Sequence, residues 1–176
     1  MEKRNVLFVM SSLRNGGAER SLVNLLQLLD YDRYNVDLLL FQNEGLFLKQ
    51  VPKAVNIISN CNKLYTLYDN NKAEALKHPY LSAIHMIGTF ISRKETNSVA
   101  KSRQYRWEHF YKKIVPELTK EYDVAIAYMQ REQTYFLVDK VKAAKKIAWV
   151  HNEYSQLGHF KEMDLEYFEK VDKVVT

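Results

Sequence analysis

The chain has 176 residues, of which 47% are hydrophobic and 27% charged, and its formal net charge is +5. This balance is typical of one globular domain with its own core, and it excludes disordered and fibrous classes. A single cysteine, Cys61, excludes an intrachain disulfide, and the N-terminal apolar run is too short for a signal peptide or a membrane span, so we expect a cytoplasmic protein.

The first part of the chain predicts two parallel strands joined by a helix. Residues 6–10 form an apolar run of strand length, and a polar loop with two glycines follows it. Apolar side chains then recur at helical spacing to about residue 29. A second, nearly continuous apolar run at 36–41 is typical of a strand buried on both faces. This order of elements predicts a right-handed βαβ unit.

Four further segments have the length and composition of short strands. They are residues 55–58, 122–128, 146–150 and 172–176. Together with the first two strands they predict an α/β fold, with a Rossmann-like parallel sheet of about six strands and helices on both faces. Because the chain ends inside the last of these strands, we expect it to be part of a longer protein.

The connections between the strands differ in character. Residues 60–71 are rich in Asn and Tyr and are expected to be irregular. Helical spacing at 72–91 and 100–120, separated by a polar break, predicts a helical hairpin inserted between strands, with Pro79 starting or breaking the first helix. A helical turn is expected near 47–51, and short helices near 133–141 and 165–169.

Ligands of open parallel sheets bind beyond the carboxyl ends of the strands, where the loops 11–17, 129–132 and 151–153 are expected. The adjacent Gly16 and Gly17 would let the first amides of the helix approach an anion or a sugar hydroxyl. The alternative is a tight turn without a ligand. The glycine spacing matches neither the dinucleotide fingerprint nor the P-loop, so both of these sites are unsupported.

His151 follows a predicted strand and is expected to face the same cleft, where it could donate to a substrate hydroxyl. A purely structural histidine is the alternative. The other histidines have no partners at metal-ligand spacing, so no metal site is predicted. The Asp30-Tyr31-Asp32 sequence is similar to a glycosyltransferase metal motif, but it lies at the opposite edge of the predicted sheet and is expected to be a turn.

The basic charge is concentrated in residues 93–113, where seven Lys or Arg residues face two Glu. Aromatic residues are interleaved with these cations. In one interpretation the segment is an exposed face that docks on an anionic membrane or on a lipid-linked phosphate acceptor. Its binding residues would be Lys101, Arg103, Arg106, Lys112 and Lys113. In the other interpretation the aromatic rings pack on the sheet and the cations are simply solvated.

Residues 6–20, Val-Leu-Phe-Val-Met-Ser-Ser-Leu-Arg-Asn-Gly-Gly-Ala-Glu-Arg, closely resemble the start of bacterial family-4 glycosyltransferases. Later segments agree, among them Trp149-Val150-His151-Asn152, whereas residues 60–120 do not. The resemblance implies the two-Rossmann GT-B architecture and a retaining transfer that needs no metal or other cofactor. The N-terminal domain would mainly receive the acceptor, and the C-terminal domain would hold most of the nucleotide-sugar donor.

By the same resemblance, Gly16 and Gly17 would lie against the donor phosphate and the transferred sugar, and the catalytic His151 beside the reacting centre. Further candidates for donor or acceptor contacts in the three loops are Arg14, Asn15, Arg131 and Asn152. The donor signature of the family, two glutamates eight positions apart, does not occur in this sequence. Residues 1–176 are therefore expected to be the N-terminal domain only, with the helical insertion at about 72–120, and to be inactive alone.

The resemblance predicts that the whole enzyme moves a hexose-type sugar onto a glycan or lipid-linked acceptor in capsule or exopolysaccharide synthesis. It would work in the cytoplasm, peripherally at the inner membrane face, and would not bind nucleic acid. The alternative from another class is a non-catalytic, Rossmann-like module that binds a sugar or a phosphate.

Overall fold

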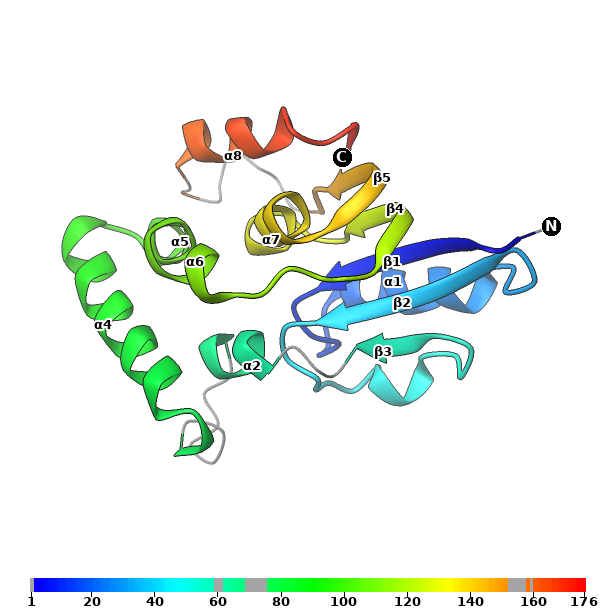
Figure 1. Ribbon diagram of the computed structural model, residues 1–176, viewed down its shortest axis with the longest axis horizontal. Helices are drawn as coiled ribbons and strands as arrows, with labels where there is room; N and C mark the ends of the chain where they lie inside the picture. The colour runs from blue at the N-terminus through cyan, green and yellow to red at the C-terminus, as the bar shows by residue number, and fades with distance from the viewer. Residues whose placement is uncertain (1, 59–61, 69–75, 152–157, 159) are drawn as a thin grey trace.

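The computed structural model describes residues 2–58, 62–68, 76–151, 158 and 160–176. Its centre is a six-stranded sheet in the order β3-β2-β1-β4-β5-β6, in which every neighbouring pair is parallel (Figure 1). The strands are β1 (Arg4–Met10), β2 (Tyr34–Leu40), β3 (Asn56–Ile58), β4 (Glu121–Ala127), β5 (Lys142–Trp149) and β6 (Lys173–Val175). This is the doubly wound order of Rossmann-like folds, so the predicted fold class is confirmed.

Helices cover the sheet and fill the long connection between β3 and β4. Those that connect neighbouring strands are α1 (Gly17–Leu28), the single turn η1 (Leu48–Gln50), α7 (Glu132–Lys140) and α8 (Lys161–Phe168). The long connection contains α2 (Asn62–Tyr68), α4 (Pro79–Glu95), α5 (Val99–Arg106), the π-helical turn η2 (Trp107–Tyr111) and α6 (Lys112–Ile114). α4 packs against α5, which confirms the predicted hairpin.

Two apolar clusters lie on opposite faces of the sheet, because successive strand side chains point to opposite sides. Phe8 and Met10 of β1 pack in the cluster that includes the buried face of α1. Leu7 and Val9 pack in the other cluster, whose members come also from α2, η2, α7 and α8. The near-continuous apolar sequence of β1 and β2 therefore reflects strands that are covered on both sides.

The structure corrects the predicted segment 60–71, because residues 62–68 form the helix α2. Leu64 and Leu67 are both buried, and their spacing of three places them on one helical face. Two turns are too short for a clear periodic pattern. Pro79 is the first residue of α4, as expected for a proline at a helix start. Cys61, the first residues of the predicted 72–91 helix and Asn152 lie outside the described residues.

Two further element boundaries differ from the prediction. β5 begins at Lys142 rather than near residue 146, because its backbone pairs with β4 from Glu121 onward although the lysine and alanine side chains there are mostly exposed. α4 continues to Glu95, and Ser98 starts α5 by accepting a hydrogen bond from the Lys101 amide (3.1 Å).

A buried carboxylate ties three strands together at the amino end of the sheet. Asp37 of β2 is 4% exposed and accepts hydrogen bonds from Asn56 Nδ2 (2.8 Å), Lys120 Nζ (2.9 Å) and Tyr122 Oη (2.8 Å). Burial alone would raise the pKa of Asp37, but these donors outweigh it and hold the pKa below its ordinary value. The ionised carboxylate is therefore the form that stabilises the fold.

We expect Asp37→Asn to lower the free energy of unfolding by about 2 kcal/mol at neutral pH, since charge-assisted hydrogen bonds are lost. Because the folded-state pKa lies below the ordinary 3.8, this contribution is present above that pH and is lost as the pH falls through the folded pKa. Urea unfolding at neutral pH and in steps below pH 4 measures it. The exposed Asp32→Asn is the control, and a pH-independent difference between wild type and Asp37→Asn would contradict the assignment.

Candidate functional site

The candidate site lies at the carboxyl ends of β1 and β4, which are neighbours in the sheet. The strand order reverses between these two strands, and open α/β sheets bind their ligands at such a switch point. All strands point toward the side of the molecule where α2, α4 and α5 lie (Figure 1). The loops after β1, β4 and β5 therefore share one edge, as the sequence predicted.

The loop between β1 and α1 is held by the loop that follows β2. Leu13 donates its amide to the carbonyl of Glu44 (2.9 Å) and accepts from the amide of Phe47 (3.1 Å). Gly45 has a φ of +131°, and a side chain there would overlap the Leu13 carbonyl. Only glycine permits this close approach of two backbones. The loop backbone is thus fixed by the protein itself.

The two glycines at the start of α1 have different surroundings. Gly16 is the residue before the helix, and a Cβ atom there would overlap the carboxylate of Glu19, which folds back over the helix start. An acidic group in the first turn suits the positive end of the helix dipole. Gly17 is exposed, and a Cβ atom there would meet nothing within 4 Å. The open side of this helix end is therefore at Gly17.

His151 follows β5, which is separated from β1 by β4. Tyr128, at the end of β4, contacts both His151 and α1. The His151 ring is 4.8 Å from the Tyr128 ring and stacks on Trp149 at 5.7 Å, with 6° between the planes. The hydroxyls of Tyr128 and Ser21, the latter on α1, share a hydrogen bond of 3.0 Å. The structure thus brings the glycine loop and His151 to one end of the sheet, on the α1 side.

The surroundings of His151 favour the neutral form of its imidazole. Burial lowers its pKa below the ordinary value, and the negative charge of Glu19 opposes the shift only in part. Its backbone amide donates to Gln130 Oε1 (3.4 Å), whereas its buried Nε2 atom has no hydrogen-bond partner among the residues that the structure describes. A neutral ring with an unengaged nitrogen can accept or donate one hydrogen bond to a ligand.

A polar cluster follows β4 on the other side of the sheet. Arg131 precedes α7 with a φ of 74°, a conformation that non-glycine residues adopt rarely. Glu132 is 2% exposed, and its carboxylate is 2.6 Å from the Arg103 Nε atom. Gln133 donates to the hydroxyl of Ser11 (2.5 Å), which links α7 to the end of β1. The charge of Glu132 raises the pKa of Arg103.

These contacts correct the predicted basic face. Arg103 points to the buried Glu132, and Arg106 donates to Thr89 Oγ1 of α4 (2.8 Å), so both serve internal contacts. Trp107 and Tyr111 are buried, as the alternative interpretation of the aromatic residues expected. The cause is the packing of α5 and η2 between α4 and α7, which turns this part of the segment inward.

The three lysines of the predicted patch also do not form one free surface. Lys101 lies over the ring of Phe160, with its ammonium 4.9 Å from the ring centre. Lys112 is 3.4 Å from Glu108 and 3.5 Å from Asp139, and is half-buried. Lys113 is exposed. The charge of residues 93–113 is therefore spread over internal and external contacts.

The remaining predicted residues lie as follows. Arg14 is exposed and pairs with Glu44, and Asn15 is exposed beside it.

In the turn before β2, the amide of Asp32 donates to Asp30 Oδ1 (3.0 Å), which confirms the turn predicted for these residues. The part of the chain that the structure describes contains no group of three His, Cys, Asp or Glu side chains that could hold a metal ion.

Sequence reasoning missed the residues that link the predicted ones. Tyr128 was assigned only to a strand, yet its ring and hydroxyl connect His151 to α1. The sequence places Glu132 in a loop and Gln133 at a helix start. Nothing in the neighbouring sequence indicates that these two polar side chains are buried. A run of polar residues after a buried strand, Gln-Arg-Glu-Gln, was the available hint, because polar groups at a carboxyl edge are placed to meet a ligand or one another.

No protein-family model, no curated protein and no solved structure matches this chain. Within the described residues, no helix is long and apolar enough to cross a membrane.

Proposed function

We propose that this chain is the acceptor-side domain of a retaining GT-B glycosyltransferase, which moves a hexose-type sugar from a nucleotide donor to a glycan or lipid-linked acceptor. The observation that carries the proposal is the meeting of the glycine loop and His151 through Tyr128 at the switch point of the sheet. The resemblance of residues 6–20 to family-4 enzymes supports the choice of reaction. Capsule or exopolysaccharide synthesis at the cytoplasmic membrane face is the setting that it implies.

The chemistry proposed for this edge needs no metal. The exposed start of α1 at Gly17 offers backbone amides and the positive end of a helix dipole to a sugar hydroxyl or a phosphate oxygen. His151, whose lowered pKa favours the neutral ring, donates to or accepts from a hydroxyl of the transferred sugar through Nε2, which has no partner among the described residues. Most of the nucleotide is bound by a second Rossmann-like domain, since the paired glutamates of the donor signature do not occur here.

A donor screen tests the proposal. The protein expressed from its complete reading frame is incubated with a panel of nucleotide-sugars and lipid-linked acceptors, and transfer of labelled sugar is measured. His151→Ala is expected to lower kcat about 100-fold or more, because a positioned hydrogen-bonding group is lost at the reacting centre. His109→Ala, at an exposed position of η2, is the matched control and should keep wild-type turnover.

Three outcomes would contradict parts of the proposal. Near-normal turnover of His151→Ala would make this histidine structural. Binding of sugar or phosphate without transfer, from a complete reading frame that encodes no second Rossmann-like unit, would favour the binding module instead. Residues 1–176 alone are expected to transfer no sugar. Measurable transfer by this segment would therefore also contradict the proposed separation of acceptor and donor binding between two domains.

A further inference from the structure

Helix α4 presents two different faces. Its inward face contains the buried Leu81, Gly88 and Ser92 and packs on α5 and α2. At Gly88 the approach is close, because a Cβ atom would lie 3.3 Å from the ring of Phe110. This contact fixes the rotation of the helix and therefore decides which residues of α4 point away from the protein.

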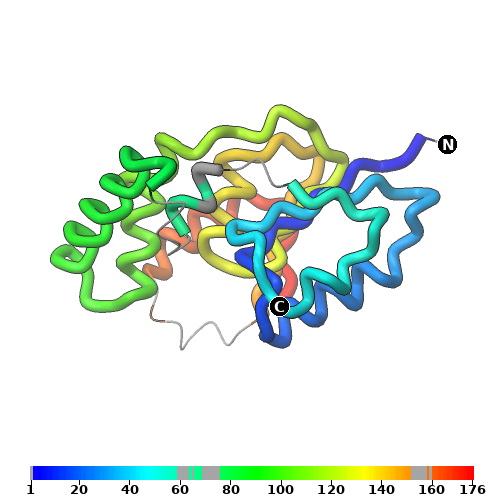
Figure 2. Tube along the Cα trace, turned by 90° about the horizontal axis from the view of Figure 1, so that it is seen from below, coloured from blue at the N-terminus to red at the C-terminus, as the bar shows by residue number. Residues whose placement is uncertain are grey.

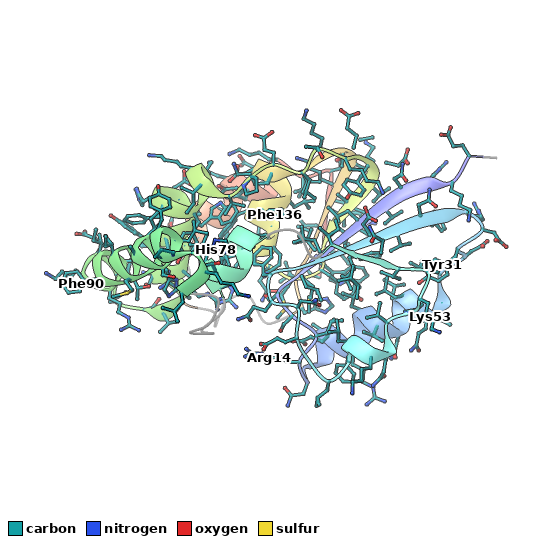
Figure 3. The ribbon with its side chains drawn as sticks, turned by 60° about the horizontal axis from the view of Figure 1, so that its bottom comes forward. Arg14, Tyr31, Lys53, His78, Phe90 and Phe136 are labelled. Carbon is teal, nitrogen blue, oxygen red and sulfur yellow. The ribbon has the colours of Figure 1, made fainter. Side chains whose placement is uncertain are left out.

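The outward face of α4 is also apolar. Tyr80 is 69% exposed, Met86 70%, Ile87 54% and Phe90 62%. Positions 80, 83, 87 and 90 follow the alternating spacing of three and four that places side chains in one stripe along a helix. α4 lies at the edge of the molecule in both orthogonal views, far from α1 (Figures 1 and 2), and Phe90 points outward there (Figure 3).

The charges around this stripe are mainly positive. Lys77 precedes the helix, and Arg93 and Lys94 lie in its last turn, all exposed, whereas Glu95, the last residue of the helix, is the one acidic residue between 76 and 95. The Lys94 ammonium is 4.4 Å from the centre of the Phe90 ring, so cation and apolar surface adjoin directly. An apolar helical face with Lys or Arg at its margins is the pattern of helices that lie in a bilayer interface.

A small pocket continues the surface at the C-terminal end of α4. Its volume is about 300 Å³, and its charged lining groups are Arg93 and Arg106. The remaining lining residues are Thr96, Asn97, Ser98, Val99 and Ser102, none of them acidic. Val99 is 79% exposed at this end and extends the apolar surface. The two arginines supply the positive charge that suits a phosphate oxygen, whereas the hydroxyls of Thr96, Ser98 and Ser102 bond within the protein.

We propose that α4 docks on an anionic lipid bilayer, with its outward face among the acyl chains and a lipid phosphate in the pocket at its C-terminal end. A second copy of the chain fits less well, because two such faces would bring like charges together. The bilayer neutralises the same cations and covers the apolar stripe. This surface shares only Arg106 with the predicted patch of Lys101, Arg103, Arg106, Lys112 and Lys113, and the inference does not rest on the proposed activity.

Vesicle sedimentation with the full chain tests the proposal. No nucleotide-sugar and no sugar acceptor is added. We expect binding to phosphatidylcholine vesicles that contain phosphatidylglycerol, and binding weaker by about tenfold or more to pure phosphatidylcholine or in high salt. Ile87→Ser/Phe90→Ser and Arg93→Gln/Lys94→Gln should each weaken binding about tenfold or more. The matched control is Leu28→Ser/Leu46→Ser, which removes two leucines of similar exposure (84% and 73%) away from α4.

Circular dichroism establishes that every variant is folded. Unchanged vesicle binding by both α4 variants, or an equal loss in the control, would overturn the proposal. Equal binding to neutral and anionic vesicles would overturn the role of the cations. Analytical ultracentrifugation supplies an independent test, because a dimer of the wild-type chain that Ile87→Ser/Phe90→Ser dissociates would assign the face to a second copy instead. None of these outcomes depends on sugar transfer.

Discussion

Arg103→Met is expected to lower the free energy of unfolding by about 3 kcal/mol, because it leaves the carboxylate of Glu132 buried without its main counter-ion. Glu132 is 2% exposed and 2.6 Å from the Arg103 guanidinium. Arg131 lies 3.9 Å from the other carboxylate oxygen and compensates in part, which is why we expect the lower end of the usual range. Methionine keeps most of the packing of the arginine stem, so charge is the main change.

Two comparisons separate the buried pair from a general effect of losing an arginine. Arg14→Met removes the partner of Glu44 in an ion pair whose side chains are 60% and 46% exposed, and should change stability by less than about 1 kcal/mol. Adding Glu132→Gln to Arg103→Met removes the unpaired charge and should recover part of the loss. Chemical denaturation measures all three. Equal effects at both arginines would show that Glu132 is not stabilised by its partner.

The largest loss of packing is expected for Trp107→Ala. Trp107 is fully buried in η2, its ring contacts those of Tyr135 and Phe136, and its Nε1 donates to Asp139 Oδ2 (3.0 Å). Truncation leaves a cavity between the helical insertion and α7 and removes one of the two donors to Asp139 Oδ2, so we expect a loss of about 3–5 kcal/mol in the free energy of unfolding.

Thermal unfolding followed by circular dichroism checks this expectation, as a fall in Tm of about 10 °C. Trp107→Phe keeps most of the ring volume but removes the donor to Asp139, so its loss should be smaller. The exposed Phe90→Ala is the control and should change stability by no more than about 0.5 kcal/mol. A small effect of Trp107→Ala would mean that the insertion contributes little to the stability of the sheet.

The sheet could be predicted because its strands carry a local signal. Strands β1 and β2 are covered on both faces, and this requirement appears directly as unbroken apolar runs. β5 shows the limit of that signal. Its first residues alternate between lysine and alanine pairs and are largely exposed, so they are placed in the sheet by backbone pairing with β4, which leaves no apolar run in the sequence.

The orientation of the basic segment could not be predicted for a different reason. A helix with regularly spaced cations fits a solvated face, and nothing local distinguishes that from a helix whose arginine pairs with a buried acid. The partner of Arg103 is Glu132, on another helix and far along the chain. Likewise Gly16, Gly17 and His151 carry local signals, whereas the role of Tyr128 between them depends on the order of the strands.

The central position of β1 has a consequence for synthesis of the chain on the ribosome. β1 pairs with β2 on one side, but its other edge pairs with β4, where Phe8 lies opposite Ile126. The three-strand unit ending at Ile58 can form long before β4 is complete at Ala127. At translation rates of about 5–20 residues per second, that interval lasts roughly 3–14 s. During this interval the apolar edge of β1 stays unpaired and can pair with another chain. Binding of a chaperone to the nascent chain would therefore limit aggregation most in this interval.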